Sequence, residues 1–229
     1  MKIIHKLFFA VLLLFVSLSS FAQDDSSFRL GIKLGGNLYS TALRVGNDFN
    51  KKIKPGFQVG LMAEYAMSET FYLQSGVEFI TKGIVLKSTQ KIEDGTSSLT
   101  KSIGLQYIQV PLMATYKLIV GSDVKVYFRG GPYTAFGIGG KTTIKRKYKN
   151  LDMVNSKDKQ DSFGDNAFKD FDLGLKFGSG LEINRFVIGL DFEYGLISIN
   201  RDNNTMTSSL SGKNFKNKGV TLSAGYYFW

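Results

Sequence analysis

Residues 186–194 have the sequence FVIGLDFEY, in which apolar residues alternate with small or polar ones. Every second position is apolar, and these positions are Phe186, Ile188, Leu190, Phe192 and Tyr194. Gly189, Asp191 and Glu193 lie between them. Because successive side chains of a β-strand point to opposite faces, the segment predicts a strand with one wholly apolar face and one face that carries two carboxylates.

The same period of two occurs along the rest of the chain and predicts eight strands. The expected strands are 28–34, 57–65, 71–79, 108–116, 124–136, 171–181, 186–194 and 220–228. Their apolar faces hold 42 residues without a single charge. The opposite faces hold five basic and five acidic residues, which are Arg29, Lys33, Glu64, Glu78, Lys125, Arg129, Asp172, Lys176, Asp191 and Glu193.

Glycine occurs mainly on the charged faces of the expected strands. Its position there indicates whether these faces meet water or the interior of a barrel. Examples are Gly31, Gly60, Gly76, Gly174 and Gly189. The polar face of a soluble sandwich or of a lipocalin-like barrel meets water, whereas side chains inside a narrow barrel must leave room for one another. We therefore expect an eight-stranded antiparallel transmembrane up-and-down β-barrel of the small OmpA/OmpX type, with its apolar face in lipid. Balanced charge inside it predicts a paired ion network that plugs the lumen.

The connections between the expected strands alternate between long and short. The long ones are 39–56, 80–107, 137–170 and 195–219, and the short ones are 66–70, 117–123 and 182–185. Outer-membrane barrels have short periplasmic turns and long external loops, so both termini should lie in the periplasm. With their boundary residues, the external segments 40–54, 81–105, 139–170 and 198–219 carry 20 basic and nine acidic residues.

The first 22 residues resemble a secretory signal peptide. Lys2 and Lys6 precede an apolar run from residue 7 to 16, and Ser20 and Ala22 stand at positions −3 and −1 of a cleavage site before Gln23. The run is shorter than the roughly 20 residues that a membrane-spanning helix needs, which disfavours the alternative of an uncleaved anchor. We expect a signal peptide over 1–22, a barrel domain over 23–229, and an outer-membrane location.

The residue inventory disfavours an enzyme, a metal site and a cofactor. The chain has no cysteine, and its one histidine, His5, lies in the expected signal peptide. Hydroxyl nucleophiles are usually activated by histidine, so a lipase, deacylase or palmitoyltransferase mechanism lacks its base. Asp191 and Glu193 would support only a carboxylate mechanism, and lumen ion pairs are the favoured alternative. Four aspartates could supply oxygen ligands to calcium, but they lack EF-hand spacing. They are Asp161, Asp165, Asp170 and Asp172.

The excess positive charge predicts an anionic partner outside the cell. A basic run in the longest connection contains Lys141, Lys145, Arg146, Lys147 and Lys149. Lysine and arginine form charge-assisted hydrogen bonds with phosphate, and lipopolysaccharide carries phosphates on the outer leaflet. We expect contact with lipopolysaccharide and other outer-membrane lipids, while simple solvation of these side chains remains the alternative. Export from the cytoplasm through the expected signal peptide argues against nucleic acid as a partner.

Short motifs recur along the expected strands, and these are Phe71-Tyr-Leu-Gln74, Thr81-Lys-Gly83, Tyr107-Ile-Gln-Val-Pro-Leu-Met113, Gly130-Gly-Pro132, Asp172-Leu-Gly174, Gly178-Ser-Gly180, Tyr194-Gly-Leu196 and Gly225-Tyr-Tyr-Phe228. With these motifs, the chain resembles outer-membrane β-barrel proteins of the PorT-like porin family from Bacteroidetes. The resemblance implies the barrel fold and the outer membrane, and supplies no catalytic residue. It also implies that the barrel-assembly machinery recognises terminal aromatics, here Tyr226, Phe228 and Trp229.

These observations predict a small outer-membrane barrel with a structural or surface-interaction role, exercised through long basic external loops. A narrow transport channel, or a component of a secretion apparatus like the namesake of the PorT-like family, is the alternative. An enzyme that acts on lipid or lipopolysaccharide is a third alternative.

Overall fold

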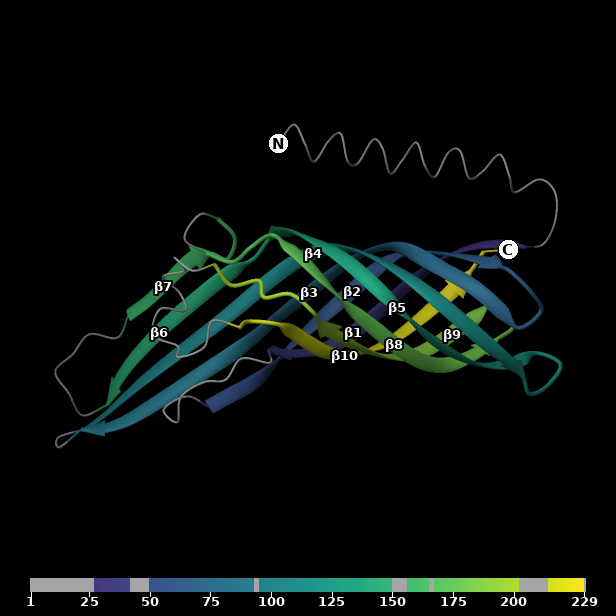
Figure 1. The fold of residues 1–229 in the computed structure, drawn as a ribbon. Helices are drawn as coiled ribbons and strands as arrows, with labels where there is room; N and C mark the ends of the chain where they lie inside the picture. The colour runs from purple at the N-terminus through teal and green to yellow at the C-terminus, as the bar shows by residue number, and fades with distance from the viewer. Residues whose placement is uncertain are drawn as a thin grey trace.

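A computed structural model describes residues 27–41, 50–92, 95–149, 156–164, 167–201 and 214–228. These residues form ten strands (Figure 1), which are β1 (Phe28–Thr41), β2 (Asn50–Ala66), β3 (Phe71–Ile92), β4 (Gly95–Ile119), β5 (Val124–Gly139), β6 (Lys141–Lys149), β7 (Ser156–Asp161), β8 (Phe171–Ile183), β9 (Phe186–Gly195) and β10 (Asn217–Tyr227). No helix within these ranges is long and apolar enough to cross a membrane. The expected signal peptide lies outside them.

Eight of the strands close into an antiparallel barrel. Its order is β3-β2-β1-β10-β9-β8-β5-β4, and an additional β3–β4 pairing joins the two ends of this series. All eight predicted segments correspond to these strands, so the predicted eight-stranded antiparallel barrel is confirmed. The start of β1 and the end of β10 lie at the end of the barrel where short turns join β2 to β3, β4 to β5 and β8 to β9, and we call this the terminal end; the extensions of β3 and β4 lie at the other, outer end (Figure 1).

The two surfaces of the barrel wall differ in polarity as the alternation predicts. Leu34 is 63% exposed and Phe186 is also 63% exposed, whereas Asp191 and Asp172 are fully buried. Aromatic rings pair across strands at both ends of the apolar outer surface, for example Phe71 with Tyr116, Phe57 with Phe79, Phe136 with Phe171 and Phe186 with Tyr226. This apolar outer surface is suited to lipid, and the aromatic rings are suited to its interfaces.

The barrel extends further beyond its outer aromatic rings than the sequence predicts. Residues 80–107 were expected to be a loop, but β3 continues to Ile92 and β4 begins at Gly95, in register from Ile80–Tyr107 to Ile92–Gly95. Within the expected loop 137–170, β6 pairs with the extended part of β4, and β7 pairs with β6. These predictions of loops were wrong because the outward apolar face stops near Phe79, while backbone pairing continues.

The apolar outer surface, which we call the apolar band, ends partway along β3. The polarity of the inward and outward faces of the strand inverts there. Within the band, Glu78 points inward and Phe79 lies on the lipid-facing surface. Beyond it, Ile84 and Leu86 are fully buried inside, whereas Lys87 is exposed outside. Water replaces lipid as the outer solvent at this level, so apolar side chains now gain by facing inward.

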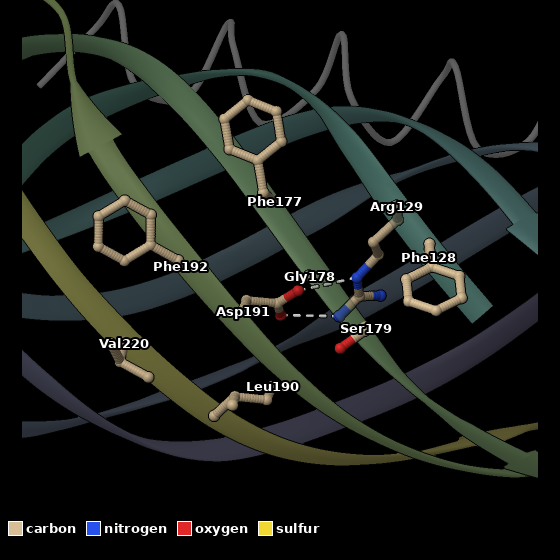
Figure 2. Close-up of a pocket in the computed structure, with 9 residues that line it drawn as sticks. All are labelled: Phe128, Arg129, Phe177, Gly178, Ser179, Leu190, Asp191, Phe192 and Val220. Atoms are coloured by element: carbon tan, nitrogen blue, oxygen red, sulfur yellow. Dashed lines mark hydrogen bonds and ion pairs between the residues drawn. The ribbon is translucent and has the colours of Figure 1, made fainter. Parts of the chain in front are cut away.

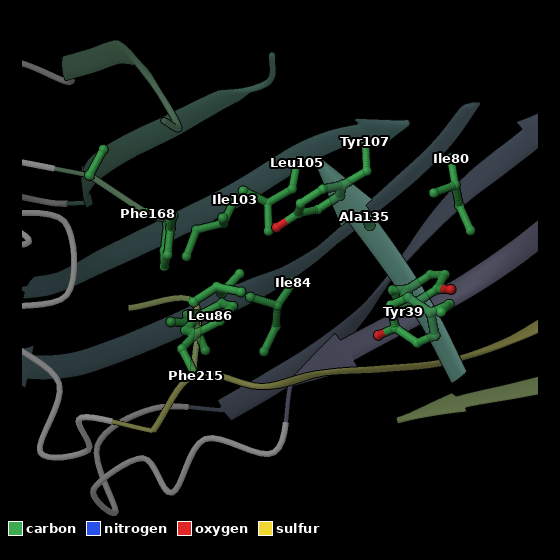
Figure 3. Close-up of a cluster of buried hydrophobic side chains, with 13 residues drawn as sticks. Tyr39, Ile80, Ile84, Leu86, Ile103, Leu105, Tyr107, Ala135, Phe168 and Phe215 are labelled. Atoms are coloured by element: carbon green, nitrogen blue, oxygen red, sulfur yellow. The ribbon is translucent and has the colours of Figure 1, made fainter. Parts of the chain in front are cut away.

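An apolar cluster closes the outer end of the barrel (Figure 3). Its members come from the extended strands, from the segments that follow β7 and β9, and from the segment that precedes β10. They include Ile84, Leu86, Ile103, Leu105, Phe168, Ile199 and Phe215. Phe168 packs on Phe215 with ring centroids 4.8 Å apart. The described segments after β7, after β9 and before β10 are thus tied to the barrel by burial of apolar surface.

Candidate functional site

The barrel interior contains a network of salt-bridged side chains, in which neutral hydrogen-bonding residues join two groups of charges. Nine of the ten predicted lumen charges take part in salt bridges there; Lys125 is half-buried near the terminal end and forms none with the described residues. Three residues that sequence reasoning had placed outside the lumen join the network, namely Lys82, Lys117 and Glu182. The twelve participants are six cations and six anions, so the network remains balanced.

At the terminal end, two cations and two carboxylates alternate in a ring. Lys117 Nζ lies 2.6 Å from Glu64 Oε1 and 2.6 Å from Glu182 Oε2. Arg29 pairs with the same two carboxylates, donating to Glu182 Oε1 at 2.8 Å. The Arg29 guanidinium also lies 4.1 Å from the centroid of the Tyr227 ring. Each carboxylate is therefore neutralised by two cations, which offsets the cost of burying it.

In the middle of the barrel, Arg129 and Asp191 form a two-point pair (Figure 2). Arg129 Nε donates to Asp191 Oδ1 at 2.8 Å, and Nη2 donates to Oδ2 at 2.7 Å. The third donor, Nη1, reaches Gln74 Oε1 at 2.7 Å. Arg129 is on β5 and Asp191 is on β9, and Gly178 on the intervening strand β8 is the register partner of both.

Lys176 connects the middle of the network to its outer part. Its Nζ lies 3.2 Å from Glu78 Oε2, 3.0 Å from Glu193 Oε1 and 3.9 Å from Asp191 Oδ2. Lys33 also pairs with Glu78. One fully buried ammonium group thus holds three carboxylates from two strands, β3 and β9.

Lys82 lies at the outer end of the network among tyrosine rings. Its Nζ is 3.1 Å from Glu193 Oε2 and 4.2 Å from the ring centroid of Tyr133. Tyr39 Oη donates to Glu193 Oε2 at 2.5 Å, and Asn217 Nδ2 donates to Asp172 Oδ2 at 2.9 Å. Sequence reasoning missed Lys82 because it lies beyond the expected end of its strand, although its even-numbered position continues the inward phase of Gln74 and Glu78. The same continuation of phase identifies Lys117 and Glu182.

These contacts leave little space in the lumen. A hollow between the terminal ring and the Arg129 pair, lined by residues that include Glu64, Gln74, Lys117 and Tyr127, has no space for a water molecule. The carboxylate mechanism considered for Asp191 and Glu193 gains no support, because both groups are held by buried cations. The calcium hypothesis gains none either, because Asp172 lies inside the barrel and Asp161 is exposed on β7, while Asp165 lies outside the described residues.

The predicted basic run is divided between two faces of the extension. Lys141, Lys145 and Lys147 share the outward face of β6, whereas Arg146 has the opposite phase and pairs with Asp158 at 3.8 Å. The side chain of Lys149 lies outside the described part of the structure. The run therefore does not form one patch.

Two lysines of β7 complete the outward face. Thr100, Lys145 and Lys157 lie in one row across β4, β6 and β7, and Ser102, Thr143 and Lys159 lie in the next. These six residues line a hollow of about 240 Å³. We name them, with Lys147, the basic face. Sequence reasoning missed Lys157 and Lys159 because it assigned their segment to a loop, where a shared face cannot be inferred.

The aromatics expected to direct assembly lie at the terminal end of the barrel. The Tyr226 ring packs against Phe186 at 4.9 Å and against Phe228 at 6.3 Å between centroids. The Phe228 amide donates to the Leu30 carbonyl at 2.8 Å, which continues the pairing of the last strand with β1. Trp229 lies outside the described residues.

Solved structures that are similar to this chain include a bacterial surface protein, an attachment protein and an outer membrane protein. Neisserial surface protein A has 14% identity over 89% of this chain and 98% of its own, with a TM-score of 0.40. The attachment invasion locus protein of Yersinia pestis has 16% identity over 90% and 100%, with a TM-score of 0.36. OprG from Pseudomonas aeruginosa has 15% identity over 88% and 96%, with a TM-score of 0.36.

Comparison with curated protein sequences finds no match. Among protein families, the model of the outer membrane protein beta-barrel domain matches residues 21–201, which is most of the chain. The closed antiparallel barrel with an apolar outer surface agrees with this match. The chain therefore belongs to the outer membrane protein beta-barrel domain family and is an outer-membrane β-barrel protein.

Proposed function

We propose that this protein is a non-conducting, non-enzymatic barrel that anchors the basic face at the cell surface, where the face binds the phosphorylated polysaccharide of lipopolysaccharide. The observation that carries the proposal is the direct cross-strand pairing of Lys145 with Lys157. Like charges placed opposite each other destabilise a sheet, and a bound anion removes that cost. Both side chains are exposed, so a polymer can reach them.

The composition of the basic face favours phosphate over a simple carboxylate. Thr100, Ser102 and Thr143 place hydroxyl groups between the lysines. Ammonium groups supply charge and hydroxyls supply further donors to the several oxygens of a phosphate. An anionic surface attracts basic segments by roughly 1 kcal/mol per residue, so several lysines together give appreciable and salt-sensitive binding.

The filled lumen supports the surface role over the alternative of a narrow channel. Eight strands enclose only enough space for side chains, and here the space contains the buried ion network and the tyrosines around Lys82. Participation in a secretion apparatus, as the PorT-like resemblance suggests, would then use the outer surface of the barrel. Export through cleavage after Ala22, and recognition of Tyr226, Phe228 and Trp229 by the barrel-assembly machinery, belong to the same proposal.

The experiment measures binding of lipid-free, phosphorylated core polysaccharide to the folded protein in micelles at low and high salt. Changing Lys145, Lys147, Lys157 and Lys159 to Gln should remove most of the affinity and most of its salt dependence. The matched control changes four other exposed lysines near the outer end, Lys51, Lys52, Lys87 and Lys218, to Gln. Equal loss in both variants, or no loss in the first, would show that the basic face is merely solvated.

A further inference from the structure

A further hollow, of about 230 Å³, lies in the barrel wall just beyond the apolar band. Its lining includes Lys54 of β2, Thr81 of β3, Gly104 and Gln106 of β4, and Lys141 of β6. Four strands thus meet around it. Lys147, Lys157 and Lys159 do not line it, so it is separate from the centre of the basic face.

The hollow exists because glycine occupies the position beneath the Lys54 ammonium. A Cβ atom at Gly104 would come within 2.6 Å of Lys54 Nζ and within 3.2 Å of the Lys141 carbonyl oxygen. Lys54 reaches this position from a point where the β2–β3 register shifts between Ile53 and Gln58. The absent side chain therefore lets the lysine lie across the wall.

Lys54 is half-buried and lacks an acidic partner in the described part of the chain. Its Nζ donates one hydrogen bond to the Ile103 carbonyl oxygen at 3.0 Å. An ammonium group has three N–H donors, so two remain for a ligand. A partly desolvated cation with only a neutral acceptor is less stable than one that is paired with an anion.

The level of the hollow corresponds to the headgroup region of the outer leaflet. Lys54 is three residues beyond Phe57, and Thr81 is two residues beyond Phe79; both phenylalanines belong to the outer aromatic pairs. A strand rises about 3.3 Å per residue, so the hollow begins within roughly 10 Å along the strands from the lipid-facing rings. On β4, Gln106 and Gly104 lie beyond Ile108 in the same outward direction, because they are the register partners of Thr81 and Gly83.

We infer that this hollow binds the phosphate group of an outer-leaflet glycolipid, with Lys54 as the central ligand and Lys141 as the second cation. The inference rests on the proposed function and deepens it: the basic face would bind the polysaccharide, and the Lys54 hollow would bind the membrane-embedded lipid A part. The acyl chains of that lipid would then lie against the apolar wall below the hollow. Phosphate is the fitting group because it accepts hydrogen bonds from two ammonium groups at once.

The test uses the full-length folded barrel in micelles doped with lipid A, and native mass spectrometry to measure retained lipid. Wild-type protein should retain phosphorylated lipid A about tenfold better than dephosphorylated lipid A, the effect of one lost charge-assisted hydrogen bond. Lys54→Gln should lower retention by a similar factor, whereas Lys52→Gln on the same strand should not. Gly104→Ala should also lower it, because the new methyl group displaces the ammonium while the lysine remains.

Two controls separate the outcomes. Gly36→Ala adds a methyl group where no atom lies within 4 Å and should retain lipid A as the wild type does. The Gln variant of Lys145, Lys147, Lys157 and Lys159 should lose polysaccharide binding but retain lipid A. The two experiments therefore test the basic face and the Lys54 hollow separately. Equal retention of phosphorylated and dephosphorylated lipid A by the wild type, or equal retention by Lys54→Gln and Lys52→Gln, would overturn the inference.

Discussion

Arg129 and Asp191 form their two-point ion pair directly over Gly178, the residue between them in the same row of the sheet. A Cβ atom at Gly178 would come within 2.0 Å of Asp191 Oδ1. The pair can close only because that position of the wall has no side chain. The glycines on the polar faces of the strands are therefore part of the packing of the lumen.

Gly178→Ala should destabilise the barrel by about 3–5 kcal/mol, the usual cost of separating a buried ion pair. The methyl group would displace Asp191 and leave the Arg129 guanidinium buried without its carboxylate. Urea unfolding in micelles, followed by circular dichroism and by heat-modifiable mobility on gels, measures the change. Gly36→Ala is the matched control, and equal unfolding midpoints for the two variants would contradict the role of Gly178.

Lys176→Met should be far more harmful than Arg146→Gln, although each removes one cation. Lys176 is buried among Glu78, Asp191 and Glu193, so its loss leaves carboxylates with reduced compensation and should cost about 3–5 kcal/mol. Arg146 and Asp158 have side chains 51% and 56% exposed, and such pairs contribute at most about 1 kcal/mol. Urea midpoints compare the two variants; similar losses would argue against a cohesive lumen network.

The purified barrel should show no large, stable conductance steps in planar bilayers. The ion network and the tyrosines around Lys82 fill the lumen, and the apolar cluster that contains Phe168 and Phe215 closes its outer end. A larger, water-filled porin in the same bilayers provides the positive control. Long-lived openings that recur with a constant amplitude would favour the channel alternative instead.

Phe168→Ala should loosen the apolar cluster at the outer end without unfolding the membrane-spanning barrel. Phe168 is fully buried and packs against Phe215, and removing such a ring costs about 3–5 kcal/mol locally. Because the cluster lies beyond the apolar band, external segments should become more sensitive to protease while heat-modifiable mobility persists. Phe128→Ala, on the lipid-facing surface, should leave protease sensitivity unchanged. If Phe128→Ala raised protease sensitivity and Phe168→Ala did not, the packing of Phe168 on Phe215 would not be what holds the external segments.

Phe228→Ser should impair assembly into the outer membrane. Its ring packs near Tyr226, and its amide extends the pairing of the last strand with β1, at the end where we expect the assembly machinery to engage. The measurement is the fraction of protein with folded mobility in the outer-membrane fraction of cells. Phe57→Ser, in an aromatic pair at the opposite end, is the control; normal assembly of Phe228→Ser would remove this residue from the signal.

Within the apolar band, the sequence by itself was enough to predict the barrel strands and the lumen-facing positions. Residues 186–194 show why: lipid outside and a confined polar space inside impose opposite requirements on successive side chains, so the pattern is local and visible in nine residues. The same reasoning failed at 80–107 and 141–161. There the outer solvent becomes water, polarity inverts, and pairing with a neighbouring strand rather than an outward apolar face maintains the strand.

The tertiary structure alone decided which charges meet. Arg129 and Asp191 are 62 residues apart, and Lys82 and Asp172 are 90 residues apart. Their pairing depends on the register of several strands and on the space above Gly178. The division of Arg146 from Lys145, and the approach of Lys54 to Gly104, likewise follow from strand phase and register shift. Sequence periodicity determines the face on which a side chain lies, but the position of its partner across the barrel depends on closure of the whole sheet.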